Sequence, residues 1–539
     1  MKYIFLIFFS LLLYPVQAKV RGVVKDSAGE PLPGANVAWV NTKIFTVTAE
    51  DGSFSVDKPK DSETLVISYI GFENDTIHVD SENVKLEIVL REGLSLGEVN
   101  VVRRRFGTTK LRSSAMNVDI ISSAELSRAA CCNLGESFVT NPSVDVSYSD
   151  AATGAKQIKL LGLSGTYVQM MTENIPNYRG AAAPYGLGYV PGPWMQSIQV
   201  SKGSSSVKNG YESITGQINV EFKKPQLPEA DWVSANLFAS STGRYEANAD
   251  ATLKLSKRWS TSLLAHYENE TMAHDANHDG FADIPRVEQY NLWNRWAYMG
   301  DHYVFQAGIK ALSEWRNSGQ VNHGGNPGQE FYKIGIDTRR YEAFTKNAYI
   351  FNKEKNTNLA LILQGTFHNQ DAVYGHKLYD VDQTNVYASL LFETEFSKRH
   401  SLSTGLSFNY DGYDQRYRLT NDVELPRLKS FEKESVPGAY VQYTYNLEDK
   451  LILMGGIRGD YSSMHGFFVT PRAHVKYNPN EFVNFRLSAG KGYRTNHVLA
   501  ENNYLLASSR KVRIAGDLDQ EEAWNYGASI SSYIPLFGK

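Results

Sequence analysis

Residues 230–539 consist of segments of about ten residues in which apolar and polar side chains alternate, separated by polar or glycine-rich turns. A period of two predicts β-strands whose two faces meet different environments. Repeated over this length, it is typical of an antiparallel transmembrane β-barrel; an array of soluble β-sandwiches is the alternative. The clearest segments are 233–240, 245–255, 261–267, 303–311, 359–367, 386–396, 403–410, 440–445 and 485–490.

The first 18 residues are typical of a secretory signal peptide. Lys2 precedes an apolar run over 4–13, and small residues up to Ala18 offer a cleavage site. The run is shorter than the roughly 20 residues of a spanning helix, so a retained anchor is the less favoured alternative. No later apolar run has that length and the mean hydropathy is −0.37, so we expect membrane insertion by strands.

The net charge of −3 gives no indication of a nucleic-acid partner. The two cysteines, Cys131 and Cys132, are adjacent, and neighbouring Cα atoms lie closer than ordinary disulfide geometry prefers. They could bind a soft metal such as copper or zinc. A buried structural pair or a strained vicinal disulfide is the alternative.

Residues 19–91 predict a small β-sandwich. Strands are expected over 20–24, 45–49, 54–56, 65–69 and 85–90, with a hairpin turn at Asp51-Gly52. The stretches 22–37, 48–56 and 65–73 resemble the carboxypeptidase regulatory-like domain, and the resemblance covers nearly the whole segment. The resemblance implies a prealbumin-like sandwich without catalytic residues.

The stretch 198–222 contains two alternating strands joined by a segment rich in glycine and serine. It resembles the end of the plug domain of TonB-dependent outer-membrane receptors of the Bacteroidetes type. The resemblance extends over 110–225 and implies an α+β plug with a helix starting at Ser122 or Ser123. Residues 157–163 and 168–176 are its expected core strands.

The linker 92–109 contains an extended apolar stretch, Leu96, Gly97, Glu98, Val99, Asn100, Val101 and Val102. It resembles the TonB box, which pairs with TonB as an added strand, because an extended segment offers its backbone hydrogen bonds to a sheet edge. A plain linker strand is the alternative.

Three further motifs resemble wall strands of the same family: residues 455–461, residues 470–477, and residues 487–494 with Glu501. The fold class is therefore expected to be mainly β: sandwich, plug and a barrel over 226–539. That region supplies roughly 14 to 16 strands. Plugged transporters have 22, so we expect a fragment or a truncated gene product. A shorter closed barrel with the plug outside is the alternative.

Two places could bind ligands. Asp275, Asn277, Asp279 and Asp283 carry oxygen ligands at calcium-loop spacing around Gly280, which predicts a structural calcium in an extracellular loop, 275–283. A solvated polar loop is the alternative. Aromatic residues and one arginine in the plug loop 172–194 could grip a large ligand, or could pack the plug against the wall. These residues are Tyr178, Arg179, Tyr185, Tyr189 and Trp194.

No catalytic motif is present, so an enzyme, such as a calcium-assisted surface hydrolase, is disfavoured, and no cofactor is required. The resemblance implies an outer-membrane transporter that contacts TonB and membrane lipid. Its expected ligand is large and scarce: an iron-siderophore, haem, a corrinoid such as cobalamin, or a metal chelate such as copper. A passive binding or adhesion protein is the alternative.

Overall fold

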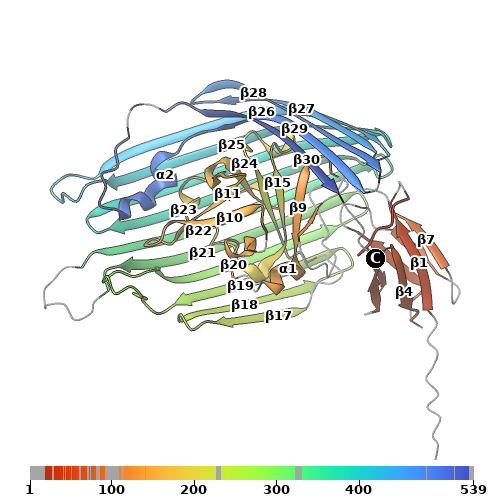
Figure 1. Cartoon of the computed structure of the whole chain (residues 1–539), viewed down its shortest axis with the longest axis horizontal. Coiled ribbons are helices and arrows are strands. Elements are labelled where there is room, and N and C mark those ends of the chain that lie inside the picture. Colours follow the sequence, from red (N-terminus) through yellow and green to blue (C-terminus); the bar gives the residue numbers. More distant parts are fainter. Residues whose placement is uncertain are drawn as a thin grey trace, which may run out of the picture. The chain divides into compact units, whose positions relative to one another are not determined.

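The computed structural model describes most of residues 19–90, then residues 108–110, 114–129, 132–139, 141–225, 232–321, 331–448, 450–480, 482–514, 516 and 518–532. The predicted signal peptide and the TonB-box-like stretch lie outside these residues. The chain divides into two compact units, of which the first holds residues 1–95 and 99–103. Figure 1 shows the elements of both units.

The N-terminal unit is a two-sheet sandwich. One sheet has the order β4 (Ser53–Asp57), β1 (Lys19–Lys25), β7 (Lys85–Val89). The other has the order β3 (Phe45–Val47), β2 (Asn36–Trp39), β5 (Thr64–Ser68), β6 (Asp75–His78). Alternate residues of both sheets, such as Val20, Trp39 and Ile67, share one buried core. The expected turn at Asp51-Gly52 forms, with Ala49 N donating to Ser53 O at 2.7 Å. The strands that it joins, β3 and β4, belong to different sheets and do not pair as a hairpin.

The plug, residues 110–225, contains a mixed six-stranded sheet ordered β14-β13-β16-β15-β9-β8. Its members are β8 (Thr108–Lys110), β9 (Asn117–Ser122), β13 (Val168–Thr172), β14 (Ile175–Pro176), β15 (Met195–Lys202) and β16 (Gly216–Phe222). A smaller sheet holds β10 (Val144–Asp150), β11 (Ala155–Leu160) and β12 (Leu163–Ser164). The predicted helix is α1 (Ser123–Arg128).

The segment 198–222 forms the centre of the plug sheet. β16 is buried at every position, because β15 and β13 flank it and both of its faces are covered. The expected strands 157–163 and 168–176 are each interrupted by a turn. In the second, Glu173 and Asn174 adopt φ values of 51° and 62°, which reverse the chain between β13 and β14.

The wall is an antiparallel sheet of fourteen described strands, each paired with its neighbours in the sequence. It consists of β17 (Val233–Ala239), β18 (Arg244–Lys254), β19 (Trp259–Glu270), β20 (Arg286–Met299), β21 (Tyr303–Gly319), β22 (Lys333–Asn352), β23 (Thr357–Tyr374), β24 (Lys377–Ser397), β25 (His400–Arg418), β26 (Leu428–Leu447), β27 (Leu451–Ser462), β28 (Gly466–Asn480), β29 (Val483–Arg494) and β30 (Glu521–Ser532).

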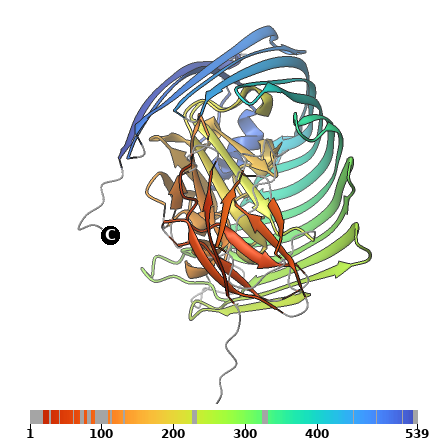
Figure 2. The ribbon, with the colours of Figure 1, turned by 90° about the vertical axis from the view of Figure 1, so that its right-hand side faces the viewer.

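The wall curves around the plug, with β17 and β30 as its two edges (Figure 2). Along β19 buried and exposed residues alternate, so Leu264 is 0 % exposed whereas Leu263 is 44 % exposed. One buried core combines plug residues such as Ile198 with wall residues such as Trp293. The plug therefore lies against the inner face of the wall, as the family resemblance implies.

The two ends of the wall differ in the length of their connections. At one end every connection is short: 255–258, 300–302, 353–356, 398–399, 448–450 and 481–482. At the other end lie the four long connections, 271–285, 320–332, 419–427 and 495–520. Outer-membrane barrels have short periplasmic turns and longer extracellular loops, so the long-loop end is the outer end.

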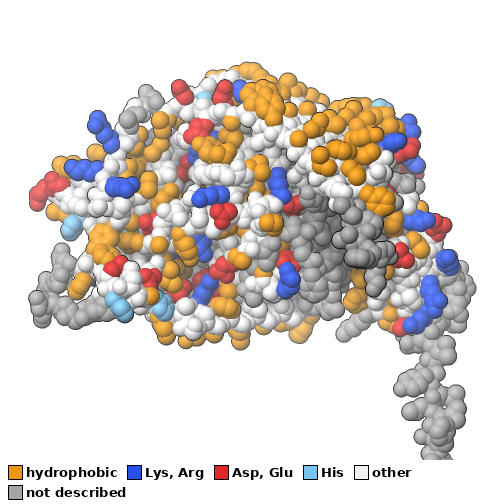
Figure 3. All heavy atoms as spheres, viewed as in Figure 1, with side chains coloured by type: hydrophobic (Ala, Val, Ile, Leu, Met, Phe, Trp, Pro, Cys, Tyr) orange, Lys and Arg blue, Asp and Glu red, His pale blue; other side chains and the backbone are white. Residues whose placement is uncertain are grey.

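Large apolar side chains cover the outer face of the wall. Figure 3 shows them gathered over the part that carries β26–β29. Near the short-turn end, exposed and half-buried aromatic rings contact one another, as in Trp259–Tyr298 at 5.1 Å and Tyr349–Phe351 at 5.0 Å. Such rings are typical of the aromatic girdle at a membrane interface. Among the described residues, no helix has both the length and the apolar character needed to cross a membrane.

Candidate ligand-binding site between the plug and the wall

The plug loop 172–194 runs along the inner face of the wall and contains two short helical turns, η3 (Gly180–Ala182) and η4 (Gly192–Trp194). Gly180 allows the closest approach: its φ is +61°, and a Cβ there would collide with the Tyr413 hydroxyl of β25. The glycines and prolines of this loop therefore let its backbone lie directly against wall side chains.

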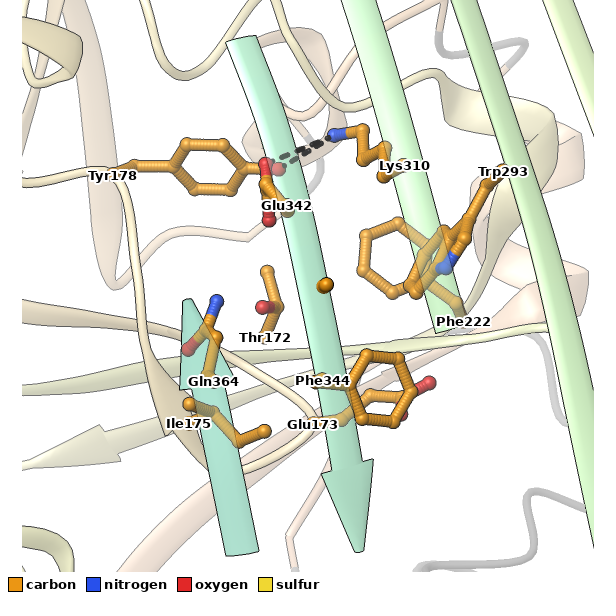
Figure 4. Close-up of a pocket in the computed structure, with 11 residues that line it drawn as sticks. Thr172, Glu173, Ile175, Tyr178, Phe222, Trp293, Lys310, Glu342, Phe344 and Gln364 are labelled. Carbon is orange, nitrogen blue, oxygen red and sulfur yellow. Dashed lines mark hydrogen bonds and ion pairs between the residues drawn. The ribbon is translucent and has the colours of Figure 1, made fainter. Parts of the chain in front are cut away.

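Tyr178 is fixed to the wall by a buried network of charged groups (Figure 4). Lys310 Nζ donates to the Tyr178 hydroxyl at 3.0 Å and forms an ion pair with Glu342 at 3.7 Å. Arg340 Nε donates to the same carboxylate at 2.8 Å, and Asn177 Nδ2 donates to it at 2.8 Å. The void beside these residues is about 20 Å³, which is room for one water.

The turn at Glu173 makes a second buried attachment. Its carboxylate lies 2.7 Å from Arg295 Nη2 and 3.5 Å from Lys346 Nζ, and Lys346 also donates to the Glu173 carbonyl oxygen at 2.8 Å. Burial alone would raise the pKa of Glu173, but Arg295, Lys346 and Lys224 outweigh it and hold the pKa at about 2. Glu173 is therefore ionised at neutral pH and binds the plug to the wall.

Three of the residues that were predicted to contact a ligand are buried between the plug and the wall. Tyr185, Tyr189 and Trp194 are at most 2 % exposed and belong to the core shared by plug and wall. Tyr185 donates to Asn503 Oδ1 at 3.2 Å, and Trp194 packs on Trp293 with ring centres 6.2 Å apart. These three residues join the plug to the wall, which is the alternative that the sequence left open.

Tyr178 and Arg179 border a cavity of about 440 Å³ at the long-loop end. Arg179 Nη1 donates to Glu212 at 2.7 Å, and its Nη2 donates to Asp411 of β25. The plug supplies the cavity with Tyr167 and Tyr211, and the wall supplies Tyr413 and Glu434. Because both parts line it, a movement of the plug would change the cavity.

The connection 495–520, which we call the strap, forms another side of the cavity. It contains α2 (Val498–Asn502) and η6 (Asn503–Ala507), and it turns inward so that Leu499, Ala500 and Leu506 join the buried core. Arg494 at its base donates to Glu501 and lies 3.3 Å from Glu521. The sequence singled out Arg494 and Glu501 as part of a motif, but it gave no signal that the strap folds inward.

His497 anchors the strap to the wall. Its Nδ1 lies 3.1 Å from a Glu432 carboxylate oxygen, and its ring packs on Tyr413 at 4.4 Å. Burial alone would lower the pKa of His497, but the Glu432 hydrogen bond and the nearby Asp411 and Glu501 raise it above its ordinary value. His497 was not among the predicted site residues, because its partners come from strands far away in the chain.

Cys132 lies at another contact of plug and wall. It is 5 % exposed, and its amide donates to Glu136 at 3.1 Å, whose carboxylate pairs with Arg244 of β18 at 2.7 Å. Burial and the nearby Glu246 raise the pKa of the Cys132 thiol. Cys131 lies outside the described residues, so soft-metal binding by the pair stays a prediction.

The predicted calcium loop, 275–283, is part of the long connection 271–285 at the outer end. Its oxygen atoms accept bonds from the loop's own amides: Asp275 from Asp279 N at 3.1 Å, and Asp283 from Ala276 N at 2.8 Å. Across the part of the chain that the structure describes, no three His, Cys, Asp or Glu side chains converge on a metal position. Calcium binding here stays a prediction.

Comparison with known families matches each part of the chain. The model of the "TonB dependent receptor-like, beta-barrel" family matches residues 354–538, and that of the "TonB-dependent Receptor Plug Domain" matches residues 110–217. The chain belongs to the TonB-dependent receptor family. A third model, the "CarboxypepD_reg-like domain", matches residues 20–101 of the receptor.

Two curated relatives are similar to parts of the receptor. TonB-dependent receptor SusC of Bacteroides thetaiotaomicron is 27 % identical over 256 residues, which is 44 % of this chain and 25 % of SusC. TonB-dependent receptor P39 of Formosa agariphila is 37 % identical over 112 residues, 21 % of this chain and 10 % of P39. The similarity thus spans a quarter or less of each relative, and the Bacteroides match with the N-terminal domain marks the Bacteroidetes type.

Solved structures share the fold. FpvA of P. aeruginosa bound to heterologous pyoverdines has a TM-score of 0.63 at 15 % identity, over 83 % of this chain and 66 % of that one. The siderophore receptor PirA of Acinetobacter baumannii gives 0.58 at 14 %, covering 77 % and 68 %. The copper transporter OprC gives 0.58 at 12 %, covering 72 % and 64 %.

Membership places the receptor in the outer membrane. The family is one of receptors and transporters and is not a class of enzymes. The predicted fold class of sandwich, plug and antiparallel wall is confirmed.

Proposed function

We propose that the receptor binds a large ligand at the outer end and passes it to the periplasm when TonB displaces the plug. The observation that carries the proposal is the cavity of about 440 Å³, which plug, wall and strap line together. A ligand held there contacts the element that has to move, so binding and plug displacement are linked. A cavity of this size suits a ligand of ordinary cofactor dimensions.

The candidate ligands are an iron-siderophore, haem, cobalamin or a copper chelate. Siderophore receptors and a copper transporter are among the structures that share the fold, which supports this group without choosing within it. Elemental analysis and mass spectrometry of material that co-purifies with the receptor would identify the ligand.

The experiment that tests energised uptake is deletion of residues 96–102. TonB coupling needs an extended segment to pair with, so the deletion should abolish cellular uptake of the co-purified ligand and leave its binding to the purified receptor unchanged. Replacement of 96–102 by glycine and serine of the same length controls for linker length and should give the same loss.

The alternative, a passive binding or adhesion protein, makes the opposite forecast. If cells with the deletion accumulate the ligand as well as wild-type cells do, the proposal of TonB-coupled uptake is wrong. Loss of binding together with uptake would mean that the segment supports the fold rather than the coupling.

A further inference from the structure

The charged groups that line the cavity are unequal in number. Among the described residues of the lining, five carboxylates stand against three Lys or Arg side chains, which leaves two negative charges in excess. His497 also lines the cavity, but its charge is paired with Glu432, which lies outside the lining. The carboxylates belong to Glu212, Asp411, Glu434, Glu501 and Glu521, and the cations to Lys156, Arg179 and Arg494. A ligand in the cavity therefore meets a negative surface.

Each cation of the lining already has a partner. Arg179 bonds both Glu212 and Asp411, so this group keeps one negative charge. Arg494 bonds Glu501 and Glu521 in the same way. The Lys156 ammonium lies over the Tyr148 ring at 5.2 Å. An anionic ligand would have to compete with these contacts for each positive charge.

Glu434 of β26 is the carboxylate of the lining that lacks an ion-pair partner among the described residues. It is 3 % exposed, and it accepts hydrogen bonds from Ser462 Oγ at 2.5 Å and Thr495 Oγ1 at 3.0 Å. No Lys, Arg or His within the described ranges forms an ion pair with it. A carboxylate buried without a countercharge is costly, and a positive group in the cavity would supply that charge.

The rest of the lining suits the same chemistry. Tyr167, Tyr211, Tyr413 and Tyr504 border the cavity, and aromatic faces attract cations. Arg494 already lies over Tyr167 at 5.8 Å and Arg458 over Tyr211 at 6.0 Å. His497 packs on Tyr413, which leaves Tyr504 as the ring without such a contact among these described residues. Gln169, 4 % exposed, donates to Asn209 O at 2.7 Å while its own carbonyl oxygen has no hydrogen-bond partner in the structure. The free carbonyl oxygen of Gln169 thus adds an acceptor to a lining whose carboxylates are already in excess.

We propose that the ligand presents a positively charged group to the cavity, where Glu434 is its main counterion. This inference rests on the proposed function, because it assigns the charge of the ligand to the site that the function uses. It covers an organic amine and a cationic metal complex alike, since both bring the same charge. An anionic metal complex would be rejected by the excess carboxylates.

Two inert octahedral complexes of similar size and opposite charge test the charge alone: hexaamminecobalt(III) and hexacyanocobaltate(III). Binding of each to the full-length receptor in detergent is measured by calorimetry at low salt. We expect saturable binding of the cationic complex and none of the anionic one. Glu434→Gln should weaken binding of hexaamminecobalt(III) by about tenfold, because one charge-assisted contact is lost.

Two further variants separate charge from folding. Thr495→Lys keeps Glu434 but places a lysine ammonium beside it. Because this ammonium neutralises the carboxylate, the variant should also lose binding of hexaamminecobalt(III). Glu354→Gln removes a carboxylate from an exposed turn at the opposite end and should change nothing. Thermal unfolding of all three variants shows whether each retains the wild-type fold.

The outcomes also separate this inference from the proposed function. Binding of hexacyanocobaltate(III), binding of neither complex, or unchanged affinity in Glu434→Gln would overturn the charge assignment and leave TonB-coupled uptake standing. If deletion of residues 96–102 left cellular uptake unchanged, the proposal of TonB-coupled uptake would be wrong. The charge preference could still be measured on the purified receptor.

Discussion

Arg472 on the wall strand β28 donates a hydrogen bond from Nη1 to the carbonyl oxygen of Gly210 in the plug, at 3.0 Å. The same guanidinium reaches Ser206 O and Tyr211 O, both at 3.1 Å, and it is 4 % exposed. One wall side chain thus holds a whole turn of the plug.

Replacing Arg472 with Met should loosen this turn, because several buried carbonyl groups lose their donor at once. We expect a loss on the order of 3 kcal/mol in the free energy of plug release. Limited proteolysis of residues 204–214 in increasing urea measures it. Arg399→Met, which removes an exposed arginine at the short-turn end, is the control and should leave the midpoint unchanged.

Glu173→Gln should weaken plug docking at pH 7 by about 3–5 kcal/mol, because the buried Arg295 and Lys346 lose the carboxylate with which they form ion pairs. The pKa of Glu173 is lowered from 4.5 to about 2, so its stabilisation is complete above pH 4.5 and is lost as the pH falls toward 2. Urea release of the plug across that pH range should show the step in wild type and not in the variant. An identical step in both proteins would contradict the assignment.

His497 should make the strap sensitive to pH. Its folded pKa is raised, so its contribution is fully present below pH 6.5 and is lost as the pH rises through the folded pKa. Glu432, Asp411 and Glu501 act on His497, and Arg494 pairs with Glu501. Burial raises the pKa of Glu501, so ionisation of Glu501 also lowers the stability of the strap as the pH rises, in a lower pH range.

Hydrogen exchange of residues 497–507 measures this effect. We expect protection to fall as the pH rises above 6.5, after correction for the intrinsic exchange rate. His497→Gln should remove the dependence, and His302→Gln, at an exposed turn of the opposite end, should keep it. Protection that does not vary with pH in wild type would refute the link.

The Cys132 thiol should be unreactive in the folded receptor, because burial raises its pKa and leaves little thiolate. In a Cys131→Ser background, a maleimide at pH 7.5 should label Cys132 only after unfolding. Copper that co-purifies with wild type and is lost in the Cys131→Ser/Cys132→Ser double variant would support soft-metal binding. Rapid labelling of native protein would show that the site opens.

Calcium should bind the loop 275–283, because its carboxylate oxygens can exchange the loop's own amides for a hard cation. Calorimetry of the receptor should show a saturable calcium signal that Asp279→Asn weakens by about tenfold or more. Asp301→Asn, at an exposed short turn, is the matched control. Equal calcium signals in the wild type and both variants would show that the loop does not bind calcium and is a solvated polar loop.

The wall strands could be predicted from the sequence because each strand has two faces in different environments. The resulting alternation of apolar and polar residues is visible within a single short segment. In β19, for example, the polar residues Ser262 and His266 are buried on the inner face, whereas the apolar Leu263 is 44 % exposed on the outer face. Leu264 departs from this pattern, because it is buried in the core that the wall shares with the plug. The break in the second plug strand was missed because it depends on positive φ values at Glu173 and Asn174, two non-glycine residues.

The roles of the plug aromatics could not be read locally. Tyr178 meets Lys310, and Tyr185 meets Asn503, across separations of 132 and 318 residues. A sequence shows that such rings are available to grip something but not whether a wall strand already occupies them. Glu434 was overlooked for a related reason: its isolation from every described cation is a property of the assembled cavity.

Besides the side-chain contacts of Glu173 and Tyr178, the attachment of the plug uses acceptors that every residue possesses. Arg472 binds Gly210 O, Lys346 binds Glu173 O and Arg295 binds Lys223 O at 2.8 Å, all of them main-chain oxygens. Such contacts depend on the path of the backbone and not on the side chains it carries. Side chains around the cavity can therefore change while these wall cations continue to hold the main chain of the plug.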